Sequence, residues 1–83
     1  MDILYFAWVR ERIGTERETI DPPAEVADVR GLMAWLARRS PGHASALGDP
    51  ARLRAAVDQQ FVPPEAPIAG AKEVAIFPPV TGG

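Results

Sequence analysis

Residues 3–9 read ILYFAWV, an uninterrupted apolar run rich in aromatic and branched side chains. A short run of this kind, bounded by polar residues, is typical of a strand that is buried on both faces of a sheet. Alternation along the strand divides its side chains between the two faces, Ile3, Tyr5 and Ala7 on one and Leu4, Phe6 and Trp8 on the other. We therefore expect the fold to be organised around a strand over residues 3–9.

The polar residues that follow predict a hairpin. Residues 10–14 suit a short helical turn that stops at Gly14. Residues 15–20 are charged but tolerate extended structure. The sequence DPP at 21–23 is expected to end this extended segment. Because this second strand is so polar, we expect it to pair with the first at an edge of the sheet.

Residues 28–39 carry the clearest helical pattern. Asp28 is a suitable N-cap. The apolar residues after it recur at the spacing of one helical face: Val29, Leu32, Met33 and Leu36. Arg38 and Arg39 fall in the expected last turn, where they favour the negative end of the helix dipole. The sequence SPG at 40–42 is expected to break the helix.

The second half of the chain leaves one assignment open. Residues 50–57 have the propensity of a helix, but Leu53, Ala55 and Val57 alternate as in a strand. The elements that follow are short: a turn at 58–60, a return strand at 61–62, a loop at 63–70 and a final strand at 72–77. The final strand would place Val74 and Ile76 on one face and Ala75 and Phe77 on the other.

This order of elements predicts an α+β fold of the β-grasp type. A mixed sheet of four to five strands would have its first and last strands adjacent at the centre, and one main helix would pack across one face. We expect one β-grasp domain over residues 1–77 and a projecting tail over residues 78–83. Because one helix covers only one face, apolar residues on the other face indicate a partner surface. The alternative is that segment 41–50 or 63–70 folds over them.

Composition narrows the possible functions. The net charge is −2 and the pI is about 5.2, which gives no basic patch for nucleic acid. The run 3–9 is too short to span a bilayer, and Asp2 precedes it where a signal peptide would be basic, so we expect no membrane and a cytoplasmic location. The carboxylates lack metal-ligand spacing and there is no cysteine. His43 lies in the sequence PGHAS, which suggests a solvated loop histidine without a role.

The end of the chain, FPPVTGG over residues 77–83, carries the chemistry that the rest lacks. Pro78 and Pro79 stiffen the exit from the final strand, so the tail is expected to project. Gly82 and Gly83 have no Cβ and can thread a narrow channel in an activating enzyme. A terminal carboxylate is a poor electrophile until it is converted to an acyl-adenylate. The sequence therefore predicts a carrier that acts through the carboxylate of Gly83.

Three motifs resemble the small, sulfur-carrying subunits of molybdopterin synthase. They are FAxVRE with a later glycine over residues 6–14, LxAAVxQ with a later valine over residues 53–62, and EVAxFPPVTGG over residues 73–83. This resemblance favours a strand within residues 50–57. It also implies interface positions at Phe6, Phe61 and Phe77, with the tail residues Pro78, Pro79, Val80 and Thr81 inserted into the partner.

The same resemblance implies a mechanism and a set of partners. A ubiquitin-activating-like adenylyltransferase would use ATP to adenylate Gly83, and a sulfurtransferase would supply sulfur to give a thiocarboxylate. The large synthase subunit would bind the tail, contribute the catalytic side chains and pass the sulfur to a pterin precursor, in a heterotetramer of two large and two small subunits. The chain itself would then bind no cofactor and no metal.

Three other functions remain open from the sequence. The chain could carry sulfur for thiazole or cysteine synthesis, although that group of carriers lacks the full FPPV block. It could be a protein modifier that forms isopeptide bonds with lysines. It could also be a ubiquitin-like binding module whose tail is inert.

Overall fold

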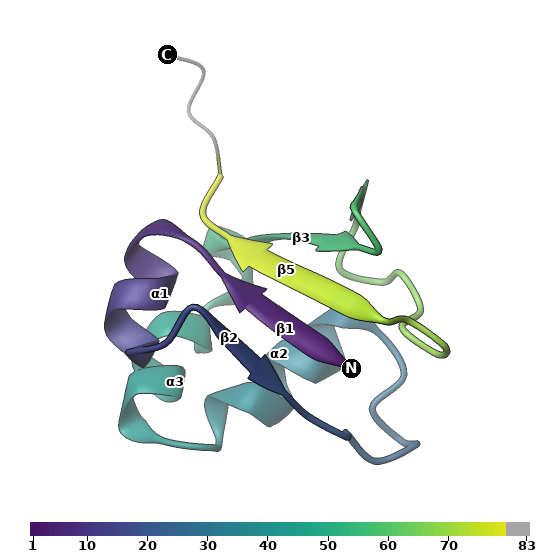
Figure 1. Cartoon of the computed structure of the whole chain (residues 1–83), viewed down its shortest axis with the longest axis horizontal. Helices are drawn as coiled ribbons and strands as arrows, with labels where there is room; N and C mark the ends of the chain where they lie inside the picture. Colours follow the sequence, from purple (N-terminus) through teal and green to yellow (C-terminus); the bar gives the residue numbers. More distant parts are fainter. Residues whose placement is uncertain (80–83) are drawn as a thin grey trace.

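The computed structural model describes residues 1–79 and shows one mixed five-stranded sheet with helices on one side (Figure 1). The strands are β1 (Asp2–Tyr5), β2 (Arg17–Thr19), β3 (Arg54–Val57), β4 (Gln60–Val62) and β5 (Glu73–Phe77). The helices are α1 (Ala7–Ile13), α2 (Val29–Ala37), α3 (Pro41–Leu47) and a 3-10 helix, η1 (Pro50–Arg52). The predicted α+β, β-grasp class is confirmed.

The sheet has the order β2-β1-β5-β3-β4, with the first and last strands of the chain side by side at its centre. β1 and β5 are parallel, while β2, β3 and β4 pair antiparallel with their neighbours. Alternate residues of the central strands are completely buried against the helices: Ile3, Tyr5, Val74 and Ile76. In Figure 1, α2 and α3 lie behind the sheet, and α1 lies beside the end of β1.

The prediction of a strand over residues 3–9 is wrong beyond Tyr5. Phe6 is extended and serves as the N-cap of α1, and Ala7 has a positive φ of 53°, which turns the chain out of the sheet. Helix α1 then buries Val9 and ends at Gly14, whose φ of 95° and N–H bond to the Arg10 carbonyl form a left-handed cap. An apolar run shows that residues are buried, but it does not distinguish a strand from a short buried helix.

The expectation of one main helix is incomplete, because α3 occupies part of the predicted loop. Ser40 caps it by accepting a hydrogen bond from the His43 N–H, and Pro41 is its first residue. A serine N-cap followed by proline starts a helix as readily as it stops the preceding one. The SPG sequence at 40–42 therefore begins α3, whereas α2 has already ended at Ala37.

Helix α2 follows the sequence pattern closely. The Asp28 carboxylate accepts a hydrogen bond from the Gly31 N–H at 2.7 Å, which confirms the N-cap. All four stripe residues are buried: Val29, Leu32, Met33 and Leu36. Arg38 and Arg39 lie just beyond the last helical residue and not in the last turn. Both interpretations of residues 50–57 are partly right: the first part is the 3-10 helix η1, and the second part is the strand β3.

Helices α1 and α3 approach each other closely at Gly42. A Cβ at this position would lie 2.5 Å from the backbone oxygen of Arg12. Real contacts do not reach this distance, and a backbone carbonyl cannot rotate away as a side chain can. Glycine at residue 42 therefore sets the separation of the two helices.

We predict that Gly42→Ala lowers the free energy of unfolding by about 1–3 kcal/mol, because the added methyl forces α3 away from α1. Urea denaturation followed by circular dichroism measures the loss. Ala44→Ser, at an exposed position of the same helix, is the control and should change stability by less than about 0.5 kcal/mol. Equal stability of the Gly42→Ala variant and the wild type would contradict the packing argument.

Candidate functional site

The sheet face opposite the helices carries a row of apolar side chains. Strand register aligns one residue from each of four strands on this face: Leu4, Ala75, Ala56 and Phe61, which we call the open-face row. Its two alanines have short side chains, so the middle of the row is recessed. Phe61 stands at one end with 84% of its surface exposed. An aromatic side chain with this exposure on an edge strand is typical of a protein interface.

The aromatic residues predicted as interface positions are only partly brought together. Phe61 and Phe77 contact edge to face, with ring centroids 5.7 Å apart and an interplanar angle of 61°. Phe6 is 47% exposed and lies at the end of β1, where its N–H donates to the Ile76 carbonyl. It therefore lies beside the end of β5. The sequence had predicted that Phe6 is part of a strand, and the structure places it after the strand has ended. The role of these three residues in binding stays a prediction.

The base of the tail lies next to α1 and η1. Pro78 is half-buried and Pro79 is exposed. Together with Trp8 and Arg52 they line a hollow of about 300 Å³. The other predicted tail residues, Val80, Thr81, Gly82 and Gly83, lie outside the described residues, so their roles remain expectations, as does the division of the chain after residue 77.

Trp8 is a residue that sequence reasoning misplaced. The strand prediction assigned it to a sheet face, whereas α1 places it beside the tail base. A signal was present in the sequence, since Trp8 and Arg12 are four residues apart, the spacing that brings two side chains together on a helix. The Arg12 guanidinium lies 4.5 Å from the Trp8 ring centre.

His43 is not the solvated loop residue that was expected. It is 7% exposed, and its two ring nitrogens contact the N-cap of α3 and a residue of strand β2. Nδ1 lies 2.7 Å from the Ser40 hydroxyl, and Nε2 lies 2.7 Å from the Glu18 carboxylate. Glu18 also accepts a 2.6 Å hydrogen bond from the Tyr5 hydroxyl. The sequence separation of 25 residues between His43 and Glu18 gives no local signal of this contact.

This Ser-His-Glu arrangement has the composition of a catalytic triad, but its geometry is that of a structural network. The Ser40 hydroxyl oxygen is occupied as the cap of α3, where it accepts the His43 N–H at 3.1 Å. A buried imidazole and a capping hydroxyl leave no exposed nucleophile for a substrate. The network therefore ties α3 to β1 and β2, with Arg39 adding an ion pair to Glu18 at 3.8 Å.

The network perturbs the acidities of its members. Burial alone would raise the pKa of Glu18, but hydrogen bonds from His43 and Tyr5 outweigh burial and hold this pKa below its ordinary value. Burial raises the pKa of Tyr5, and the neighbouring Glu18 carboxylate raises it further. Glu18 is therefore ionised and Tyr5 protonated at neutral pH.

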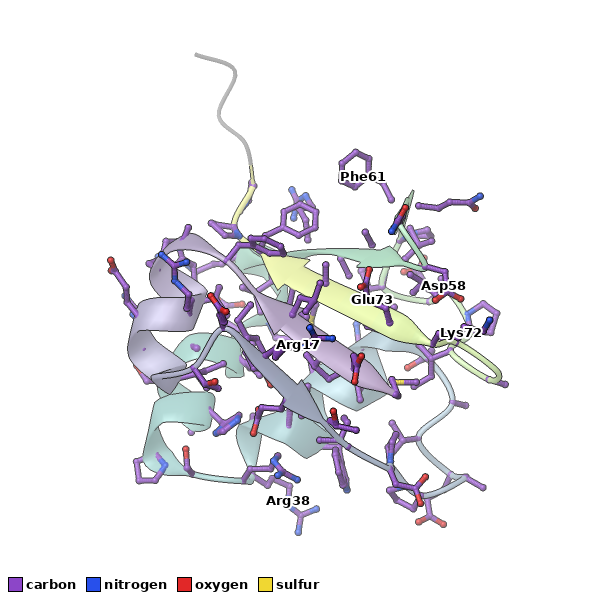
Figure 2. The ribbon with its side chains drawn as sticks, viewed as in Figure 1. Arg17, Arg38, Asp58, Phe61, Lys72 and Glu73 are labelled. Carbon is purple, nitrogen blue, oxygen red and sulfur yellow. The ribbon has the colours of Figure 1, made fainter. Side chains whose placement is uncertain are left out.

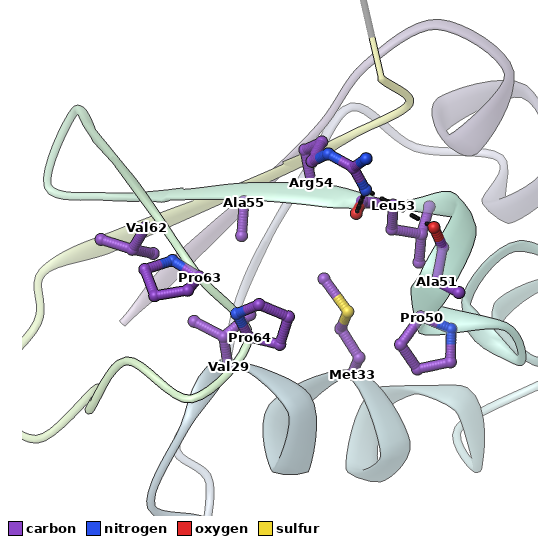
Figure 3. Close-up of a pocket in the computed structure, with 10 residues that line it drawn as sticks. All are labelled: Val29, Met33, Pro50, Ala51, Leu53, Arg54, Ala55, Val62, Pro63 and Pro64. Atoms are coloured by element: carbon purple, nitrogen blue, oxygen red, sulfur yellow. Dashed lines mark hydrogen bonds between the residues drawn. The ribbon is translucent and has the colours of Figure 1, made fainter.

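A second hollow lies between α2 and the β3–β4 edge (Figure 3). It has a volume of about 230 Å³ and a mostly apolar lining that includes Val29, Met33 and Val62. Arg54 reaches its rim, where its guanidinium donates to the Leu53 carbonyl at 2.8 Å. Cofactor pockets usually exceed about 300 Å³ and present several convergent polar groups. This groove does not have the form of a cofactor site.

Residues 1–79 contain no group of three histidine, aspartate or glutamate side chains that could hold a metal ion. In the same part of the chain, no helix is both long and apolar enough to cross a membrane. The predicted cytoplasmic location stays a prediction. The candidate functional site is thus the open-face row together with the base of the tail.

The sheet order, the crossover helix and the chain end leaving the central strand define a ubiquitin-like β-grasp protein. Residues 3–83 match the sequence profile of the ThiS family, and the chain belongs to that family. An Escherichia coli protein named molybdopterin synthase sulfur carrier subunit is 42% identical over 81 residues, which covers 98% of this chain and 96% of the relative. A Haemophilus influenzae protein of the same name is 32% identical over 83 residues, covering 100% and 99%. The resemblance inferred from the motifs is confirmed.

Solved structures agree with this fold. SAMP1 from Haloferax volcanii superposes with a TM-score of 0.76 at 25% identity, covering 100% of this chain and 98% of the other. A Pyrococcus furiosus protein superposes with a TM-score of 0.64 at 23% identity, covering 95% of each chain, and supports the fold alone.

We predict that Glu18→Gln lowers the free energy of unfolding at pH 7 by about 1–2 kcal/mol, because the bonds to His43 and Tyr5 lose their ionic character. The folded-state pKa of Glu18 is depressed, so its contribution is complete above the unfolded value of about 4.3 and is lost as pH falls through the folded value. Urea denaturation between neutral and acidic pH should show the two proteins converging in stability.

The matched control for this experiment is Glu25→Gln, which removes one carboxylate at an exposed position. It should leave both the stability at pH 7 and its pH dependence close to those of the wild type. A constant difference between wild type and Glu18→Gln at every pH would show that the carboxylate charge contributes nothing.

Proposed function

We propose that this chain is a sulfur carrier for molybdenum cofactor synthesis. In this proposal an adenylyltransferase uses ATP to activate the carboxylate of Gly83, and a sulfurtransferase supplies the sulfur that turns it into a thiocarboxylate. The large subunit of molybdopterin synthase then binds the tail, and the sulfur passes to a pterin precursor.

One observation carries the proposal: the 42% identity to the Escherichia coli sulfur carrier subunit extends over 98% of this chain. The family match itself runs to Gly83 and so includes the FPPVTGG block. The two glycines supply backbone that can pass through a narrow opening, and the two prolines stiffen the segment that leads to them.

The proposed chemistry needs little from the carrier's own side chains. A carboxylate oxygen attacks the α-phosphorus of ATP and pyrophosphate leaves. A sulfide-level sulfur nucleophile then attacks the carbonyl carbon, and AMP leaves with one of the original carboxylate oxygens, so that a thiocarboxylate remains. Positioning of ATP and sulfur belongs to the partner enzymes in this scheme, so what the carrier contributes is an accessible chain end and a surface that the partners recognise.

The open-face row is the surface on which we place the large subunit. Phe61 projects from edge strand β4 and is backed by Phe77, the last residue of β5 before the tail. A partner that covers this aromatic pair also reaches the tail base, because the two are continuous along β5. The same docking in two copies would give the heterotetramer that the family resemblance implies.

The deciding experiment is incubation of the chain with the adenylyltransferase, ATP and a sulfur source, followed by a sulfur-reactive alkylating probe. Because the chain has no cysteine, we expect labelling only at a C-terminal thiocarboxylate. Mass analysis should use the C-terminal peptide, since exchange of oxygen for sulfur has nominally the same mass shift as oxidation of Met1 or Met33. A C-terminal peptide that keeps its carboxylate under these conditions would refute sulfur carriage.

The control for labelling is a chain that lacks Gly82 and Gly83, which should not be modified. Conjugates to other proteins that survive reducing gels would favour an isopeptide-forming modifier. Thiocarboxylated carrier, not treated with the probe, that supports thiazole or cysteine synthesis but not molybdopterin synthesis with the large subunit would favour one of those pathways. Full function of the truncated chain would support the inert-tail module.

We also predict that Phe61→Ser weakens binding to the large subunit by at least tenfold, about 1.4 kcal/mol, because it removes an exposed aromatic anchor. The free energy of unfolding should change by less than about 0.5 kcal/mol, since Phe61 as a residue is already 84% exposed. Isothermal titration calorimetry measures the affinity. Gln60→Ser, the neighbour that points to the other side of β4, is the control, and equal affinities for the two variants would contradict this surface.

A further inference from the structure

The end of the molecule from which the tail leaves is rich in arginine. Four exposed arginines belong to the elements next to the tail base. Two are on α1, one is on η1 and one is on β3: Arg10, Arg12, Arg52 and Arg54. Within residues 1–79, the salt bridges involve other cations, namely Arg17, Arg39 and His43. These four guanidiniums therefore have no carboxylate partner in the described part of the chain, and the exposed Glu11 between two of them forms no ion pair.

Trp8 holds two of these guanidiniums in place. Arg12 lies 4.5 Å from the centre of the indole ring and Arg52 lies 5.4 Å from it. Arg12 is fixed further by a hydrogen bond from Nη1 to the Ser45 carbonyl at 3.3 Å. An arginine that stacks on an aromatic ring keeps its outward N–H groups available while losing side-chain freedom. Each of these guanidiniums is thus pre-arranged to receive an anion.

The same cluster borders the hollow at the tail base. Trp8 and Arg52 form one side of this space of about 300 Å³, and Pro78 and Pro79 form the other. A group that enters the hollow would touch the indole, a guanidinium and the first two residues of the tail at once. A partner can therefore recognise the tail base as a unit before it engages the glycines.

We infer that Trp8, Arg12 and Arg52 form a docking point for an acidic segment of the protein that receives the tail. The identity of that receiving protein rests on the function proposed above. Guanidinium groups pair with carboxylates through parallel hydrogen bonds, so each of the two arginines offers a binding position for an aspartate or glutamate on a partner loop. The hollow beside it accommodates the rest of that side chain or its neighbour.

Charge and distance favour a carboxylate-bearing protein over nucleic acid. The chain has a net charge of −2, and nucleic acid binding requires a broad basic face. Six residues separate the start of the tail from its end, so the reacting carboxylate can be up to about 20 Å from this cluster. That distance exceeds the Debye length of about 8 Å at physiological salt. With the tail fully extended, a docking carboxylate here would therefore have little effect on the electrostatics of the reacting group.

The test is the affinity of the full chain for two proteins of the same organism, the adenylyltransferase and the large synthase subunit, measured by calorimetry at about 50 and 300 mM NaCl. The Arg12→Gln/Arg52→Gln variant should bind at least one of them about tenfold more weakly at low salt. It should also lose most of the salt dependence of that binding. Arg12→Lys/Arg52→Lys keeps the charge without the planar fork and should retain an intermediate affinity.

The matched control is Arg30→Gln/Arg38→Gln, which removes the same charge elsewhere. Arg38 lies at the opposite side of the molecule from the end of β5 (Figure 2), and this variant should bind as the wild type does. Urea denaturation of each variant separates a binding defect from a folding defect. Trp8→Leu, which removes the stacking surface but no charge, should weaken binding less than loss of both arginines.

Three results would overturn the inference: equal binding by the Arg12/Arg52 and Arg30/Arg38 glutamine variants, no binding of the wild type to either protein, or displacement of the bound partner by a short oligothymidylate. The thiocarboxylate assay is run separately on the wild type. Its failure would refute the proposed function while the binding comparison still decides the role of the arginines.

Discussion

The parallel pairing of β1 with β5 is the interaction on which the rest of the structure depends. Asp2 to Tyr5 lie in register with Glu73 to Ile76, so the two ends of the chain form the centre of the sheet. This register buries Ile3, Tyr5, Val74 and Ile76 on one face. It also fixes where the tail begins, because the Phe6 N–H bonds to the Ile76 carbonyl and holds the start of α1 against the end of β5.

The arrangement of helices on a single side follows from the same pairing. Parallel strands need a crossover, and the connection between β2 and β3 supplies it through α2 and α3 on one face. The Ser40–His43–Glu18 network then links α3 to the sheet across a long sequence separation. The opposite face keeps small side chains at its centre and aromatic ones at one end. A sheet face that the helices leave uncovered is therefore a direct consequence of the topology.

The elements that could be predicted are those whose signals are local. Helix α2 has its cap and stripe within ten residues, and the strand content of 73–77 follows from alternation. The early end of β1 and the early start of α1 could not be predicted in this way, although the strand at residues 3–5 and the helical turn ending at Gly14 were, because the turn depends on a positive φ of 53° at Ala7 that is uncommon for alanine. Helix α3 has few large apolar residues, and it depends on the contact of Gly42 with α1. The burial of His43 depends on Glu18, which no local pattern could reveal.

The candidate site was likewise predictable only where the sequence carries a local signal or a family motif. Alternation along the final strand assigned Phe77 to the face opposite Val74 and Ile76, and the family resemblance added Phe61; the structure brings the two rings together. Trp8 could be placed beside the tail only after α1 was known to be a helix. Its position has a physical consequence: the indole and two guanidiniums lie together where β5 ends, whereas the glycines that the proposed chemistry requires lie several residues further along the sequence. On the function proposed above, recognition at this base and reaction at the carboxylate of Gly83 would be separated along the chain, so that different enzymes could hold one surface while each acted on the same carboxylate.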